Sequence, residues 1–413
     1  MAHTCRWGIL ATGASPLLEL FPQGPGSPAR TPEAPRFAPP RTGWISTKFV
    51  LDLLADPSTR DVSDVRHEVV AVGSRSRESA AKFVESVWKE AGVTEGQDKV
   101  KTHGSYDELF ADANVDCIYV GSPHSHHYAH VHAALSAGKN VLCEKSLVVN
   151  AAQADALIQL ARAKDLFLME AVWTRFQPYS YKLQEVVRSG VIGQVKAVQA
   201  ELCADFTSQS DEHRLRNPYL AGGALLDLGL ALVLLPPSEA SSEPLPVPKV
   251  AASVLKTTTG VDESVIAGLT FKQSDGRLVH GSLTTAQDRQ TAPNRCSYIQ
   301  GTQGYIEVAF PTYRPRAFTY YGWDQPEDFS AHASGDSSKK PTRTETFEFD
   351  ERPGGIWGFA WEADEVARCL RDAKKESERM PLRESLLMMQ VFDEIRRQGE
   401  FVFPEELETL ELQ

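Results

Sequence analysis

The sequence predicts a two-domain α/β protein. We expect a doubly wound parallel sheet over residues 1–170 and, over residues 171–413, an α+β domain with a large open, mostly antiparallel sheet. In the first part, short apolar strands without alternation separate longer helical segments, which is typical of parallel sheets covered on both faces. In the second part, the strands are longer, rich in threonine and partly alternating, which is typical of sheets with one covered face.

The elements of the first domain alternate along the chain. The predicted strands are residues 7–10, 67–74, 117–123, 140–146 and 166–172. The predicted helices are residues 47–56, 77–92, 127–138 and 151–165. This order indicates a doubly wound fold, which binds its ligands outside the carboxyl ends of the strands.

The second domain is expected to be mainly sheet, with helices at its end. The predicted strands are residues 195–206, 249–259, 264–271, 277–286, 295–310 and 342–349. Two amphipathic helices follow over residues 356–375 and 381–399, and Gly399 is the predicted C-cap of the second.

Composition limits the class of partner. Of 413 residues, 43 are Lys or Arg and 55 are Asp or Glu, giving a net charge of −12. This balance argues against nucleic acid or an anionic membrane as the main partner and favours a small molecule. The apolar run of residues 224–237 contains Asp227 and is too short to span a bilayer. Six scattered cysteines without a CxxC pair, and no secretory segment, favour a reduced cytoplasmic setting.

The first strand leads into an interrupted phosphate-binding motif. Residues 14–43 contain eight prolines, so we expect a disordered, exposed insertion. Without it, the sequence fits a G-x-G-x-x-[GA] motif in which Ala11 and Ser46 replace the outer glycines. Small residues there let a pyrophosphate approach the backbone and the helix N-terminus. The predicted cofactor contacts are Ala11, Thr12, Gly13, Trp44 and Ile45.

The second strand ends in Ser74 and Arg75. An acidic residue at this point would prefer the ribose hydroxyl of NAD, whereas a hydroxyl and a guanidinium suit the 2′-phosphate of NADP. We therefore predict NADP as the cofactor, with both residues in contact with it. An ordinary solvated arginine after a strand is the alternative.

Two further strand ends carry polar residues. Ser122, His124 and His127 lie in a histidine-rich segment after one strand and are predicted to contact the cofactor. No carboxylate cluster accompanies these histidines, so no metal is predicted. Glu144 and Lys145 end the next strand, where a lysine can orient a substrate hydroxyl or exchange a proton. An exposed ion pair at a strand end is the alternative for these two residues.

Taken together, these segments resemble the Gfo/Idh/MocA oxidoreductase family over nearly the whole chain. The matching stretches are RWGILATG, GSPHSHHYAHVHAALSAGKNVLCEKS, EAVWTRFQP, IGQVKAVQAEL, RLRNPYLAGGALLDLG, GTQGYIEV and the C-terminal ADEVARCLRDAKKES. Within the family, the chain is most similar to the dimeric dihydrodiol dehydrogenases and the fungal NADP-dependent D-xylose 1-dehydrogenases.

The resemblance implies a Rossmann domain, a C-terminal domain for substrate and subunit contacts, and a nicotinamide between them. It implies an NADP-dependent dehydrogenase that converts D-xylose to D-xylono-1,5-lactone, or trans-dihydrodiols to catechols. Lys145 matches the lysine of the family's EKP motif, and Asp227 matches the aspartate of D-x-G-x-[YH]; these two are the predicted catalytic residues. Trp173 and Arg175 match residues near the nicotinamide and substrate. An open sheet face would need a partner, so we also expect a homodimer through the C-terminal sheet.

The chain departs from the family pattern in ways that bear on catalysis. Ser146 replaces the proline after the lysine, which we expect to loosen the lysine's backbone. Ala231 occupies the position of the acid/base tyrosine or histidine, and the segment after Gly229 is shorter than the family helix. Loss of general acid/base help typically costs about 10²–10⁴-fold in rate. A non-catalytic NAD(P)-binding regulatory protein on the same fold is therefore the alternative function.

The insertion and the short segment both fall inside otherwise intact motifs. We interpret them as errors in the exon boundaries assigned to the gene rather than as evolved features, with a regulatory proline-rich arm as the alternative for the insertion.

Overall fold

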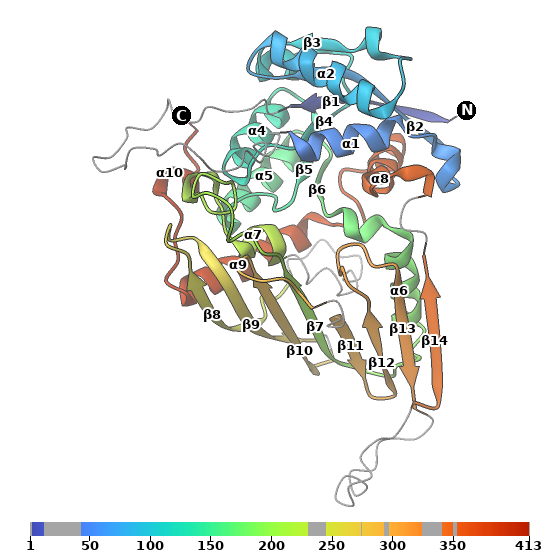
Figure 1. Ribbon diagram of the computed structural model, residues 1–413, viewed down its shortest axis with the longest axis vertical. Coiled ribbons are helices and arrows are strands. Elements are labelled where there is room, and N and C mark those ends of the chain that lie inside the picture. Colours follow the sequence, from blue (N-terminus) through green and yellow to red (C-terminus); the bar gives the residue numbers. More distant parts are fainter. Residues whose placement is uncertain are drawn as a thin grey trace, which may run out of the picture.

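The structure is a computed structural model of the chain (Figure 1). The structure describes residues 2–11, 43–229, 245–273, 275–292, 297–323, 341–349 and 353–412. Thr12, Gly13, residues 14–42 and Ala231 lie outside this set. Figure 1 shows two bodies, the upper one around the first sheet and the lower one around the second.

The first sheet has six strands in the order β3-β2-β1-β4-β5-β6, and every pairing is parallel. Its strands are β1 (His3–Leu10), β2 (Val65–Gly73), β3 (Lys101–His103), β4 (Cys117–Val120), β5 (Asn140–Glu144) and β6 (Leu168–Ala171). This order confirms the predicted doubly wound domain. Only β3 was missed, because its three residues carry no apolar pattern.

Helices cover both faces of this sheet. They are α1 (Trp44–Leu54), α2 (Arg77–Ala91), α3 (Tyr106–Phe110), α4 (His124–Ser136) and α5 (Ala151–Ala163), and α6 (Pro178–Arg188) leads into the second body. The strands are buried on both faces: all four residues of β4 are fully buried. Burial on both faces is the physical reason for their unbroken apolar sequence.

A helix from the C-terminal part completes the first body. Helix α8 (Phe359–Arg371) lies beside α1 (Figure 1). The Asp52 carboxylate of α1 accepts hydrogen bonds from four backbone N–H groups at the start of α8, those of residues 357–360, at 2.7–3.2 Å. The carboxylate thus satisfies N–H groups that a helix N-terminus leaves without partners. Residues 359–371 therefore pack with the first sheet, although they were assigned by sequence to the second domain.

The second sheet has eight strands in the order β14-β13-β12-β11-β7-β10-β9-β8, of which only β7 and β10 pair in parallel. The strands are β7 (Val195–Cys203), β8 (Lys249–Lys256), β9 (Asp262–Lys272), β10 (Leu278–Ala286), β11 (Ser297–Gly301), β12 (Gly304–Val308), β13 (Ala317–Gly322) and β14 (Arg343–Glu348). The predicted large, mostly antiparallel sheet is confirmed.

The remaining helices are α7 (Ala224–Leu228), α9 (Leu382–Gln398) and α10 (Glu405–Glu408). Gly399 is the C-cap of α9, as predicted, although Glu400 rather than the glycine takes the left-handed conformation (φ 49°). Among the described residues, no helix is long and apolar enough to cross a membrane.

Candidate functional site

The end of β1 and the start of α1 meet. The Ser46 hydroxyl donates to the Leu10 carbonyl at 3.5 Å. Within the part of the chain that the structure describes, no side chain caps the N-terminus of α1, and its first turn carries no acidic residue. An uncapped helix N-terminus at the carboxyl end of a parallel strand is where a pyrophosphate binds in this type of fold. Ala11, Trp44 and Ile45 thus lie at the predicted junction.

The carboxyl end of β2 carries Ser74 and Arg75. The Ser74 side chain is buried, and its hydroxyl has no hydrogen-bond partner among the described residues. Arg75 is exposed beside it. A buried hydroxyl without a partner is costly. A hydroxyl and a guanidinium at this strand end fit a bound phosphate group such as the 2′-phosphate of NADP.

The histidines after β4 hold neighbouring backbone together. His124 contacts the carbonyls of Ala221 and Lys145 at 3.3 and 3.2 Å. His127 lies between the carbonyls of Ser122 and Ser146, at 2.7 and 2.8 Å. Burial lowers the pKa of His124 to about 3 and that of His127 to about 4, and a neutral ring donates to only one of its two carbonyls. Their observed role is to fix the backbone that follows β5.

The two predicted catalytic residues meet. The Lys145 ammonium, at the end of β5, donates to the Asp227 backbone carbonyl at 2.6 Å and to Asp227 Oδ1 at 3.2 Å. Asp227 lies on α7, beside the second sheet. The pair therefore joins the two bodies where the resemblance predicts a nicotinamide.

The serine after the lysine is bonded to α7. The Ser146 hydroxyl donates to the Leu226 carbonyl of α7 at 2.8 Å and is fully buried. Together with His127, it holds the backbone of residue 146 in place. The expected loosening of the lysine's backbone stays a prediction.

Asp227 has a second cationic partner that the sequence did not single out. Arg214 Nη1 and Nη2 donate to Asp227 Oδ1 and Oδ2 at 3.0 and 3.2 Å. Burial acts to raise the pKa of Asp227, but Arg214 and Lys145 outweigh it and hold that pKa well below its ordinary value. The carboxylate is therefore ionised at every physiological pH. The only sequence signal for Arg214 is its place in the RLRNPYLAGG stretch.

Asp262, at the start of β9, holds the helix that carries Asp227. Its Oδ2 accepts from the Leu225 N–H of α7 at 2.6 Å. A Cβ on Gly223 would lie 1.9 Å from Asp262 Oδ1, so only glycine fits beside this carboxyl. Sequence reasoning missed Asp262, because nothing near residue 262 indicates that it meets α7.

Glu144 is buried below Lys145. It accepts from the Tyr119 hydroxyl at 2.6 Å, and burial raises its pKa to about 7. Burial, together with Glu144 and Asp52, raises the pKa of Glu362 well above its ordinary value. Neither carboxyl oxygen of Glu362 has a partner among the described residues. Glu144 and Glu362 are therefore buried carboxyl groups of high proton affinity.

Trp173 and Arg175 have structural partners of their own. The Trp173 ring stacks on Phe359 of α8, with centroids 4.5 Å apart. The Arg175 guanidinium forms a buried ion pair with Glu384 of α9 and donates to the Arg379 carbonyl at 3.0 Å. These contacts tie the segment after β6 to α8 and α9. Contact with cofactor or substrate stays a prediction for both residues.

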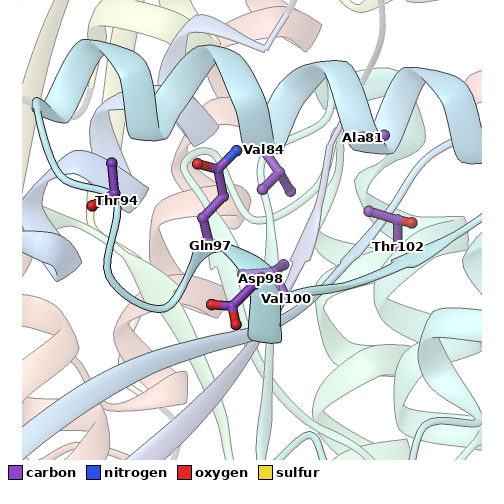
Figure 2. A pocket seen from close by; sticks show the side chains of 7 residues that line it. All are labelled: Ala81, Val84, Thr94, Gln97, Asp98, Val100 and Thr102. Atoms are coloured by element: carbon purple, nitrogen blue, oxygen red, sulfur yellow. The ribbon is translucent and has the colours of Figure 1, made fainter.

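Within the described chain, a metal-binding cluster is absent, and a groove lies apart from the predicted site residues. No group of three or more His, Cys, Asp or Glu side chains that could hold a metal occurs within it. A groove of about 460 Å³ is lined by α2, the turn after it and β3. Gln97, Asp98 and Thr102 are among the lining residues drawn in Figure 2. None of the predicted site residues lines this groove.

Two family models match the chain in succession. Residues 42–172 match the oxidoreductase family with an NAD-binding Rossmann fold, and residues 181–307 match the GFO/IDH/MocA C-terminal domain. The chain is 40% identical to a D-xylose 1-dehydrogenase (NADP(+)) of Hypocrea jecorina, over 89% of this chain and 93% of that protein. It is 34% identical to a trans-1,2-dihydrobenzene-1,2-diol dehydrogenase of Macaca fuscata fuscata, over 88% and 96%.

The chain belongs to the Gfo/Idh/MocA oxidoreductase family. Membership confirms the predicted oxidoreductase and, at the level of the family, its nicotinamide dinucleotide. The match to the first Gfo/Idh/MocA model begins at residue 42 and so leaves out β1. The structure nevertheless places β1 between β2 and β4, as a Rossmann sheet requires.

Solved structures agree with the Gfo/Idh/MocA architecture. A levoglucosan dehydrogenase in complex with NADH and levoglucosan matches with a TM-score of 0.69 at 15% identity, covering 98% of this chain and 100% of that one. An aldose-aldose oxidoreductase from Caulobacter crescentus matches with a TM-score of 0.65 at 18% identity, covering 96% and 98%. At these identities the likeness shows the fold alone.

Proposed function

We propose that this chain is an NADP-dependent dehydrogenase that oxidises the CH–OH group of a cyclic sugar or diol. D-xylose, converted to D-xylono-1,5-lactone, is the first candidate substrate, and a trans-dihydrodiol converted to a catechol is the second. The observation that carries the proposal is the Lys145–Asp227 contact at the carboxyl end of the Rossmann sheet. The names of the two relatives support the choice of substrates.

The residues of the Rossmann edge fit NADP. The uncapped N-terminus of α1, with Ala11 beside it, would hold the pyrophosphate. Ser74 and Arg75 would bind the 2′-phosphate, which would give the Ser74 hydroxyl the partner that it lacks among the described residues. We propose that the other predicted residues contact the nicotinamide end of the cofactor. They are Ser122, His124, His127, Glu144, Lys145, Trp173 and Arg175.

When bound, oxidised NADP supplies the hydride acceptor. In the substrate, the C1–H bond breaks with its electron pair leaving as hydride, the C1–O bond becomes a carbonyl, and the hydroxyl proton must go to a base other than Lys145, which is already protonated. Lys145 would orient that hydroxyl. Its charge stabilises the oxyanion that forms as the proton leaves. Asp227 holds the ammonium in place.

The family's acid/base position holds Ala231, which cannot accept a proton. We therefore propose that water takes the hydroxyl proton in this chain while the Lys145 ammonium stabilises the oxyanion, at a cost of about 10²–10⁴-fold in kcat relative to a family member with the tyrosine.

The test is a turnover assay beside a cofactor titration. Purified protein is mixed with NADP and D-xylose, or with a trans-dihydrodiol, and the absorbance of the reduced nicotinamide is followed. NADPH binding is measured separately by fluorescence. Turnover of either substrate supports the proposal. Tight NADPH binding without turnover of any sugar or diol overturns it.

That second outcome would favour the alternative function, a non-catalytic NAD(P)-binding regulatory protein. The alanine at position 231 is the observation that favours it. The retained Lys145–Asp227 pair counts against it, because a protein that only binds a nucleotide does not need this pair.

We also propose a homodimer through the open face of the second sheet. Leu255, Ile266 and Leu278 are 61%, 58% and 58% exposed on β8, β9 and β10. The strand registers place all three on the same face. Sedimentation velocity tests this proposal: a monomer at micromolar concentration would contradict it, and Ile266→Glu should dissociate a dimer.

A further inference from the structure

We propose that Arg214 is a positioning residue, which clamps the Asp227 carboxylate so that it directs the Lys145 ammonium without neutralising it. This inference rests on the proposed function, because it assigns Arg214 a part in the same reaction. Arg214 lies between β7 and α7, in the C-terminal half of the chain, whereas Lys145 ends β5 of the first sheet.

The geometry gives the two cations different roles. Arg214 uses two guanidinium nitrogens on the two carboxylate oxygens, a bidentate arrangement that fixes the plane of the carboxylate. Lys145 reaches Oδ1 only, and its shorter contact is with the backbone carbonyl of Asp227. The lysine alone would leave the carboxylate free to rotate about its side-chain bonds. Arg214 therefore sets the direction from which Asp227 meets Lys145.

The backbone of α7 is held by other groups. The Asp262 carboxylate accepts from the Leu225 N–H, and the Ser146 hydroxyl donates to the Leu226 carbonyl. Neither contact involves Arg214. Removal of the guanidinium should therefore move the Asp227 side chain while the helix that carries it stays in place.

The charges give a second consequence. Two cations share one carboxylate, which is 9% exposed, whereas the Arg214 side chain is 50% exposed. Without Arg214, the Asp227 carboxylate would pair with Lys145 alone and cancel its charge. With Arg214, the three groups together carry a net charge of +1 where a substrate hydroxyl would lose its proton. Fixed positive charge at a developing oxyanion lowers the barrier.

The test compares Arg214→Met and Arg214→Lys with Arg216→Met. Arg216 lies in the same loop and pairs with Asp211, away from Asp227, so its variant is the matched control. We expect Arg214→Met to lower kcat by about 10- to 100-fold, because misplaced catalytic groups cost that much. The control should stay within about twofold of the parent, and so should the Kd for NADPH in all variants. Arg214→Lys keeps the charge without the fork and should recover only part of kcat.

A purely structural role is separated by chemical rescue. The Arg214 side chain is half exposed, so guanidinium ion should reach the site vacated in Arg214→Ala and raise kcat there, but not in the parent. A kcat for Arg214→Met within about twofold of the parent would overturn the inference.

A readout without turnover keeps the inference separate from the proposed function. In a crystal structure of Arg214→Met, we expect the Asp227 carboxylate to rotate away from its present position while the Ser146–Leu226 bond persists. An unchanged Asp227 carboxylate would overturn the inference even if the parent protein turns over no substrate. If the carboxylate moves and the parent has no turnover, the proposed function fails and the positioning role of Arg214 stands.

Discussion

Gly121 and Ser46 are so close that no carbon atom fits between them. A Cβ built on Gly121 would lie 2.5 Å from the Ser46 hydroxyl and 2.9 Å from a ring carbon of Tyr119. Gly121 follows β4, and Ser46 lies in the first turn of α1. The start of α1 is thus packed against the sheet, although it is separated in sequence from β1. The proposed phosphate-binding end of the Rossmann domain lies at this close approach.

Gly121→Ala should therefore displace the start of α1. We expect a loss of about 1–3 kcal/mol in the free energy of unfolding, typical of overpacking, and a higher Kd for NADPH. Thermal denaturation and a fluorescence titration measure the two effects. Adding Ser46→Ala should recover part of both losses, because the nearest clashing atom is removed. Equal losses in the single and double variants would contradict this explanation.

Lys145→Met should abolish most of the activity and leave the fold intact. Loss of the group that orients the hydroxyl should lower kcat by about 10²–10⁴-fold. Lys164→Met is the control. Lys164 is an exposed lysine at the C-cap of α5, and its ammonium donates to the Ser136 carbonyl. Steady-state kinetics with D-xylose measure the effect. A Lys145→Met kcat equal to that of the control would show that Lys145 has no part in the reaction.

Asp262→Asn should change how stability depends on pH. Burial raises the pKa of Asp262 from 3.8 to about 7. Between these values the unfolded chain has released the proton and the folded chain has kept it, so stability falls as pH rises from about 4 to about 7. Asparagine caps α7 equally well and does not titrate. The slope difference between parent and variant should approach about 1.4 kcal/mol per pH unit.

Denaturant unfolding across that pH range measures this difference. Glu144 also has a raised pKa, but it is present in both proteins and cancels in the comparison. Parallel stability curves for the parent and the variant would mean that Asp262 does not hold its proton in the folded state.

Asp364→Asn should loosen α8 from the first sheet. The Asp364 carboxylate accepts from Arg60 Nε and Nη2, both at 2.8 Å, and contacts His67 Nε2 at 2.9 Å, with these side chains about 1% exposed. Breaking a buried ion pair typically costs about 3–5 kcal/mol, because one charge stays buried without its partner. Urea denaturation measures the loss of stability.

The same helix offers the control for this prediction. Arg368 pairs with Asp64 at 2.8 Å, but their side chains are 35% and 44% exposed. Arg368→Met should therefore cost no more than about 1 kcal/mol. Similar losses for the two variants would show that burial of the pair is not what stabilises α8.

Removal of residues 14–43 should improve cofactor binding. The variant joins Gly13 to Trp44 and restores an uninterrupted motif of small residues before α1. Closing a long loop costs free energy that grows as about (3/2)RT ln n, and the variant avoids this cost. We expect a lower Kd for NADPH and a higher melting temperature. Sequencing the transcript across both unusual segments is the companion experiment, and recovery of both as written would refute the exon-boundary interpretation.

The sequence by itself determined the fold class and the principal candidate residues. Runs of apolar residues such as those of β4 mark strands buried on both faces, and this signal is local, so it can be read without a structure. The motifs around Lys145 and Asp227 carry the family resemblance, and the structure brings these two residues together.

Only the tertiary structure decided which distant residues complete the site. Arg214 and Asp262 hold Asp227 and its helix, and α8 returns to the first sheet, yet nothing local in their sequences indicates these partners. The physical reason is that periodicity and caps report on neighbours along the chain. Ion pairs and helix caps between separate elements depend on how the two sheets pack, which no short stretch of sequence encodes.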